Sequence, residues 1–198
     1  MSPPHQKPAD PPSLPGTPVK LVEESEKRSD YLVWSDYFMA LAILASKRSK
    51  DPTTQVGCVI VDRDNKVLGT GYNGMPIGCD DDEMPWGKGD MNPLRNKHAF
   101  VVHAEQNALI NSLGKAEGCT LYTVLFPCNE CAKIIVQHKI REVVYMLDRN
   151  TWEMEGARIL FKKTGIIYKQ FKTRLPSVTL SFDKDCYETD KRFDKHDA

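Results

Sequence analysis

The chain has 198 residues, a length that fits one domain of ordinary size together with a tail. Its 27 basic and 27 acidic side chains cancel, which argues against nucleic acid as the main partner, because nucleic-acid binders usually carry a basic surface. No apolar run approaches the roughly 18 residues of a membrane-spanning helix, and the N-terminus lacks the basic-then-apolar pattern of a secretory signal. We therefore expect a cytoplasmic protein that binds neither membrane nor nucleic acid.

Both ends of the chain differ in composition from its middle. Residues 1–27 are rich in proline and polar side chains, and they cannot bury enough apolar surface to offset the entropy lost on ordering. We expect a disordered N-terminal tail there, a folded domain over residues 28–183, and a charged C-terminal tail over residues 184–198.

The first predicted elements are a helix and a hairpin. Apolar residues recur at helical spacing over residues 31–47, and Ser29 or Asp30 is a suitable N-terminal cap. Residues 55–61 and 66–72 are rich in β-branched side chains and flank a short polar turn, a pattern that predicts two antiparallel strands.

After a long irregular stretch over residues 77–95, predicted helices and strands alternate. Periodicity, capping residues and β-branched runs predict helices over 103–113, 128–139 and 150–164, and strands over 120–125, 142–147, 166–171 and, more briefly, 178–182. This order implies a mixed sheet with helices on both faces, and functional groups then gather at the ends of strands and the starts of helices.

Two short motifs at predicted helix starts carry a metal-binding pattern. His103 opens one helix, and Cys128 and Cys131 open another. One imidazole and two thiolates are typical zinc ligands, and three protein ligands leave a fourth position open, as catalytic zinc sites require. Helix N-termini favour negative charge and so stabilise thiolates. We predict that these three residues bind one catalytic Zn²⁺.

Glu105 lies two residues after His103 and is not needed as a ligand. When ionised it can take a proton from a zinc-activated water, and when protonated it can deliver that proton to a ring nitrogen and help an amine leave. The combination His-x-Glu and Pro-Cys-x-x-Cys is the signature of zinc-dependent nucleobase deaminases. We therefore predict that Glu105 is the catalytic residue.

Several residues have more than one interpretation. A Cys-x-x-Cys pair alone also occurs in dithiol redox proteins and in structural zinc sites. Asn73, which follows the second strand, can aim its amide at a sugar hydroxyl or simply suit a turn. We interpret His98 as a loop residue and His138 as a packing or surface residue of its helix.

The assembled motifs resemble the deoxycytidylate (dCMP) deaminase family from about residue 30 to residue 183. The zinc motifs belong to the whole deaminase superfamily, whereas the loop over residues 71–76 and the long insert before His103 point to its nucleotide branch. The pieces that carry the resemblance are Arg48-Ser49-Lys50-Asp51-Pro52, Gln55-Val56-Gly57, Gly71-Tyr72-Asn73-Gly74-Met75-Pro76, Gly78-Cys79-Asp80-Asp81, Pro85-Trp86, His103-Ala104-Glu105-Gln106-Asn107-Ala108 and Leu125-Phe126-Pro127-Cys128-Asn129-Glu130-Cys131-Ala132-Lys133.

The resemblance implies a three-layer α/β/α cytidine-deaminase-like fold with a mixed five-stranded sheet. It implies a hydrolase that deaminates dCMP to dUMP and thereby supplies thymidylate synthesis, assembled as a homohexamer, activated by dCTP and inhibited by dTTP. By matching motif, the ligand and proton-carrier roles above carry over, and Asn73 holds the deoxyribose. The loop over residues 71–78 takes part in the regulatory nucleotide site, where Mg²⁺ is a candidate second cofactor.

Two other functions remain open from the sequence. A deaminase acting on tRNA or DNA would share the zinc motifs, although the balanced charge and the acidic loop over residues 80–83 disfavour it. A catalytically inactive regulatory homologue would keep zinc for folding alone, although such a protein has no need of Glu105. The basic run over residues 47–50 is a candidate for attracting the substrate phosphate.

Overall fold

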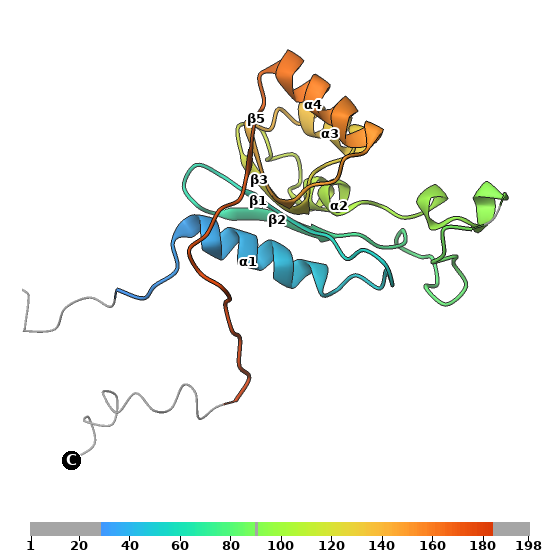
Figure 1. Ribbon diagram of the computed structural model, residues 1–198, viewed down its shortest axis with the longest axis horizontal. Helices are drawn as coiled ribbons and strands as arrows, with labels where there is room; N and C mark the ends of the chain where they lie inside the picture. Colours follow the sequence, from blue (N-terminus) through green and yellow to red (C-terminus); the bar gives the residue numbers. More distant parts are fainter. Residues whose placement is uncertain (1–28, 90, 184–198) are drawn as a thin grey trace, which may run out of the picture. The chain divides into compact units, whose positions relative to one another are not determined.

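The computed structural model describes residues 29–89 and 91–183 (Figure 1). The chain divides into two units, residues 1–31 and 32–198, and only residues 29–31 of the first are described, so the fold is that of the second unit. The tails expected over residues 1–27 and 184–198 lie outside the described residues, and the domain boundaries stay predictions. Within the described ranges, no helix is long and apolar enough to cross a membrane.

A mixed five-stranded sheet lies at the centre of the fold in the order β2-β1-β3-β4-β5. Strand β1 pairs antiparallel with β2 and β3, whereas β3, β4 and β5 run parallel, so their carboxyl ends lie at one edge of the sheet. The strands are β1 Gly57–Val61, β2 Val67–Tyr72, β3 Thr120–Leu125, β4 Glu142–Leu147 and β5 Ile167–Gln170.

Helices cover both faces of this sheet. Helix α1 (Trp34–Ser46) lies on one face, and α2 (Ala104–Asn111), α3 (Asn129–Gln137) and α4 (Trp152–Thr164) lie on the other (Figure 1). Side chains along a strand alternate between faces, so Val59 and Val61 of β1 pack with α1 while Cys58 and Ile60 pack in the opposite apolar cluster. The predicted three-layer arrangement and mixed sheet are confirmed.

Three local predictions were wrong. Helix α1 begins at Trp34 after Val33, which makes no side-chain capping bond, so neither Ser29 nor Asp30 caps it. Residues 178–182 form no strand, because they pair with no other strand among the described residues, and Phe182 is 99% exposed. The stretch over residues 77–95 was expected to be irregular, but it ends in a short 3₁₀ turn, Pro93–Arg95, and a second such turn, Lys97–Ala99, follows it.

A buried ion pair fixes the long insert before α2 to the segment that precedes β1. The ammonium of Lys97 lies 2.7 Å from both carboxylate oxygens of Asp51, and it also donates to the Thr53 hydroxyl. The two charged side chains are only 5% and 3% exposed. Burial alone would raise the pKa of Asp51, but the hydrogen bonds from Lys97 and from the Thr53 and Thr54 amides hold that pKa below its usual value.

We expect Lys97→Met to lower the free energy of unfolding by about 3–5 kcal/mol, because it leaves the Asp51 carboxylate buried without its cation. Urea unfolding followed by circular dichroism measures the change. Lys139→Met, which breaks an exposed pair with Glu117, should cost at most about 1 kcal/mol. The double variant Asp51→Asn/Lys97→Met should lose less unfolding free energy than the sum of the losses in Asp51→Asn alone and Lys97→Met alone. Additive losses would show that the two charges do not stabilise each other.

Candidate active site

The starts of α2 and α3 bring three potential metal ligands together. His103 is the N-cap of α2, Cys128 is the N-cap of α3, and Cys131 lies in the first turn of α3. The Nδ1 atom of His103 lies 3.4 Å from Sγ of Cys128 and 3.3 Å from Sγ of Cys131. All three ligand atoms lie within 4.8 Å of one another, and they form the one such cluster that the described residues contain.

The sheet holds these helix starts in position. Strand β3 ends at Leu125, and Phe126 and Pro127 lead directly into Cys128. Helix α2 approaches β2 so closely that a Cβ atom on Gly71 would lie 2.3 Å from the Ala104 carbonyl oxygen, and only glycine allows this contact. The Gln106 side chain accepts a hydrogen bond from the His103 amide at 2.9 Å and so fixes the first turn of α2.

The donor set fits zinc. The pKa of the Cys128 thiol is lowered to about 4, first because Cys131 donates a hydrogen bond to it and further because His103 lies beside it. The pKa of Cys131 is raised well above its usual value by that same hydrogen bond and by burial, so Cys128 is the thiol that ionises first. The Cys128 thiolate in turn raises the pKa of His103. Cys128 therefore loses its proton readily, and Cys131 would release its proton when it binds a metal. One imidazole and two sulfurs are the combination of ligands that zinc prefers.

Glu105 lies beside this cluster, with its side chain buried (4% exposed). Its Oε1 accepts a hydrogen bond from the Thr123 hydroxyl at 3.2 Å, and its Oε2 accepts one from Sγ of Cys131 at 3.4 Å. Burial raises its pKa, although the charge of His103 partly opposes that shift. Among the described residues Glu105 forms no ion pair with a lysine or arginine, and such a buried carboxylate is costly and typical of functional sites.

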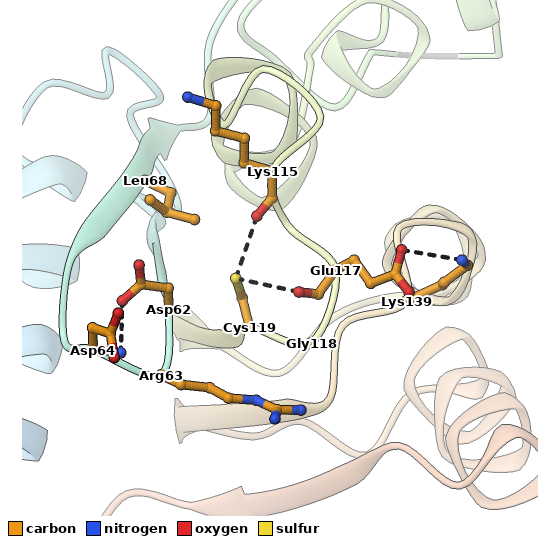
Figure 2. A pocket seen from close by; sticks show the side chains of 9 residues that line it. All are labelled: Asp62, Arg63, Asp64, Leu68, Lys115, Glu117, Gly118, Cys119 and Lys139. Atoms are coloured by element: carbon orange, nitrogen blue, oxygen red, sulfur yellow. Dashed lines mark hydrogen bonds and ion pairs between the residues drawn. The ribbon is translucent and has the colours of Figure 1, made fainter. Parts of the chain in front are cut away.

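A pocket of about 900 Å³ opens above the cluster, and Glu105, His103 and Cys128 line it. A second pocket, of about 590 Å³, lies at the opposite end of the strands, where the β1–β2 turn meets the segments that precede β3 and β4 (Figure 2). There Lys139 pairs with Glu117 at 3.1 Å, and Cys119 donates to two backbone carbonyls. None of the predicted site residues lines that second pocket.

The structure places Asn73 in the wall of the larger pocket with its amide already engaged. Its Oδ1 accepts from the Val56 amide at 2.8 Å, and its Nδ2 donates to the Thr54 carbonyl at 3.0 Å. The side chain is 7% exposed. In this arrangement Asn73 supports the segment that precedes β1, and its contact with a sugar stays a prediction.

The remaining predicted polar residues are distributed as follows. The basic run over residues 47–50 does not line the larger pocket, and Lys50 instead pairs with Asp81. His98 does line it, and burial followed by the charge of Lys97 lowers the pKa of His98. His138 hydrogen-bonds the Ile134 carbonyl at 3.0 Å and belongs to no metal cluster among the described residues.

Two residues of the site were missed by the sequence reasoning. Thr123 is fully buried in β3 and hydrogen-bonds Glu105, and no local pattern singles it out, because β3 also carries the hydroxyls of Thr120 and Tyr122. Arg149 lines the larger pocket just beyond the carboxyl end of β4. Its position at a strand end, where open α/β sheets place functional groups, could have singled it out.

The chain is similar to known deaminases over most of its length. The model of the cytidine and deoxycytidylate deaminase zinc-binding region matches residues 32–147. Deoxycytidylate deaminases from Mus musculus and Homo sapiens are each 47% identical over 161 residues, which are 80% of this chain and 90% of each relative. The crystal structure of dCMP deaminase from the cyanophage S-TIM5 in complex with dCMP and dUMP is 28% identical and covers 69% of this chain and 95% of that chain, with a TM-score of 0.57.

The matched region includes both zinc motifs and four of the five strands. The convergence of an imidazole, two thiols and a buried carboxyl group at one pocket is the arrangement that the sequence signature predicts. The chain therefore belongs to the cytidine and deoxycytidylate deaminase family of zinc-dependent enzymes.

Proposed function

We propose that this chain catalyses the hydrolytic deamination of dCMP to dUMP and ammonia. The observation that carries the proposal is that His103, Cys128 and Glu105 line one pocket, with the buried Cys131 within ligand distance of His103 and Cys128. The choice of dCMP is supported by the 47% identity to deoxycytidylate deaminases and by the similarity to a phage enzyme solved with dCMP and dUMP.

In this proposal His103, Cys128 and Cys131 hold the zinc ion. When bound, zinc acts as a Lewis acid that activates water at neutral pH. Glu105 is the proton carrier of the chain: its carboxylate takes a proton from the attacking water and donates it to N3 of the cytosine ring. A second proton passes through Glu105 to the departing amine, the bond between C4 and the amine breaks, and the water oxygen becomes the new carbonyl.

The surroundings of Glu105 suit this exchange of protons. The Thr123 hydroxyl, 3.2 Å from Oε1, restricts the orientation of the carboxyl group. Burial raises the pKa of Glu105, so a larger fraction of this carboxyl group is protonated near neutral pH than for an exposed glutamate. A group that must both accept and donate a proton works best when neither form is strongly favoured.

We expect Glu105→Gln to keep zinc and the fold but to lower turnover at least roughly 10²-fold, because an amide cannot carry the proton. The assay follows ammonia release from dCMP, with zinc measured by mass spectrometry and the fold by circular dichroism. Glu117→Gln, an exposed substitution outside the site pocket, is the matched control and should retain the parent rate. Normal turnover in Glu105→Gln would refute the assigned role.

Removing the metal should abolish activity reversibly. We expect one zinc per chain, no turnover after dialysis against a chelator, and recovery when one equivalent of zinc is restored. The reason is that the proposed reaction relies on the metal to activate the attacking water. Cys128→Ser should lower zinc affinity in the same titration. Full turnover in a metal-free chain would refute the metal-dependent mechanism.

A substrate screen separates dCMP from the competing polynucleotide substrates. We expect ammonia release from dCMP and none from a single-stranded DNA or a tRNA anticodon stem-loop, because the pocket of about 900 Å³ is of the size that holds a small molecule. Cytidine, deoxycytidine and the di- and triphosphates complete the panel. Release from the oligonucleotides alone would identify a polynucleotide deaminase.

The remaining expectations stay predictions under this function. They are supply of dUMP for thymidylate synthesis, activation by dCTP and inhibition by dTTP through the loop over residues 71–78, and Mg²⁺ with the regulatory nucleotide. They also include a homohexamer, a cytoplasmic location and a deoxyribose contact from Asn73. Repeating the assay with dCTP or dTTP present, together with light scattering, tests regulation and assembly in the same preparation.

A further inference from the structure

Arg149 is a cationic side chain of the larger pocket that forms no ion pair with a carboxylate in the described part of the chain. It follows the carboxyl end of β4 and lines the pocket above the zinc-ligand cluster. Its guanidinium donates to the Thr54 hydroxyl at 3.3 Å, which bridges two segments that are 95 residues apart in sequence. None of the ion pairs within the described residues involves Arg149.

The backbone of Arg149 is tied to the zinc-binding segment through charged and aromatic contacts. Its amide donates to Oδ1 of Asp148 at 2.8 Å, and Arg158 donates to both oxygens of Asp148 at 2.7 and 2.6 Å. The Arg158 guanidinium lies 4.8 Å from the ring centre of Phe126, two residues before Cys128. The base of the Arg149 side chain is therefore held relative to the metal ligands, while its exposed guanidinium stays available.

The other charged residues of the pocket leave Arg149 as the best-placed free cation. Lys97 forms a buried ion pair with Asp51. Burial lowers the pKa of His98 and so favours its neutral form. Lys88 also lines the pocket, but it belongs to the insert and makes no ion pair in the described part of the chain. Four acidic residues line the pocket as well. Asp51 pairs with Lys97, Glu105 lies beside the zinc-ligand cluster, Glu130 pairs with Lys133 at 2.6 Å, and Glu153 lies in the first turn of α4.

We propose that Arg149 determines specificity by binding the phosphate of a nucleoside monophosphate, so that the pocket selects it over the uncharged nucleoside. The inference rests on the proposed function. A guanidinium presents paired donors that match phosphate oxygens, and its present partner, a neutral hydroxyl, binds it more weakly than a phosphate would. The cytosine ring then lies toward Glu105 and the phosphate toward the pocket mouth.

The test uses the zinc-loaded full chain and isothermal titration calorimetry with dUMP and deoxyuridine, which are not turned over. The measured quantity is the ratio of the two dissociation constants. We expect dUMP to bind at least about tenfold more tightly than deoxyuridine, and Arg149→Gln to reduce this ratio about tenfold, the usual effect of losing one hydrogen-bonded charge pair. The exposed substitution Arg174→Gln is the matched control and should keep the parent ratio.

Two further variants separate phosphate binding from a purely structural bridge. Thr54→Val removes the hydroxyl that Arg149 now contacts and should keep the parent ratio, whereas an equal loss in Thr54→Val and Arg149→Gln would overturn the inference. It is also overturned if Lys88→Gln lowers the ratio and Arg149→Gln does not, or if the parent binds both ligands equally. If the chain prefers dUMP to deoxyuridine as expected but releases no ammonia from dCMP, the proposed function is refuted while the phosphate-binding role of Arg149 stands.

Discussion

The site depends on the meeting of two helix N-termini at the carboxyl end of β3. A helix start presents unpaired amides and the positive end of its dipole, and it therefore favours thiolates on the side chains that it carries. Here α3 supplies Cys128 and Cys131 while α2 supplies His103, and the three ligand atoms lie within 4.8 Å of one another. The burial of Glu105 follows from holding α2 against the sheet, because Glu105 lies in the first turn of that helix.

The same geometry leaves polar groups where an apolar core would be more stable. Glu105 is buried beside the ligands without a basic partner among the described residues, and Thr123 is the hydroxyl that orients it. On the other side of the pocket, Lys97 and Asp51 are buried together and satisfy each other. The first arrangement keeps a reactive carboxyl group, and the second fixes the long insert as a wall of the pocket. Thus the buried carboxyl group of the proposed reaction has no lysine or arginine partner among the described residues, whereas the buried charges that hold the insert in place are paired.

The mixed sheet explains why one end of the molecule carries the site. Strands β3, β4 and β5 are parallel, so their following segments emerge together, and these segments bring Cys128 and Arg149 to the same pocket. The antiparallel strands β1 and β2 contribute the opposite wall through Val56 and Asn73. At the other strand end the charges of Lys139 and Glu117 largely satisfy each other, and no metal-binding cluster forms there within the described residues (Figure 2).

Most helices and strands and the candidate zinc motifs were predictable from the sequence, because neighbours along the chain encode them. Strands β3 and β4 have the predicted bounds, Gly165 ends α4 in the left-handed conformation, and the ligand motifs lie at the predicted helix starts. The folded structure was needed to establish the strand order, the hydrogen bonds of Asn73, the Lys97–Asp51 pair across 46 residues and the Arg149–Thr54 contact across 95. Those contacts depend on how distant segments pack, which no local spacing or capping residue records.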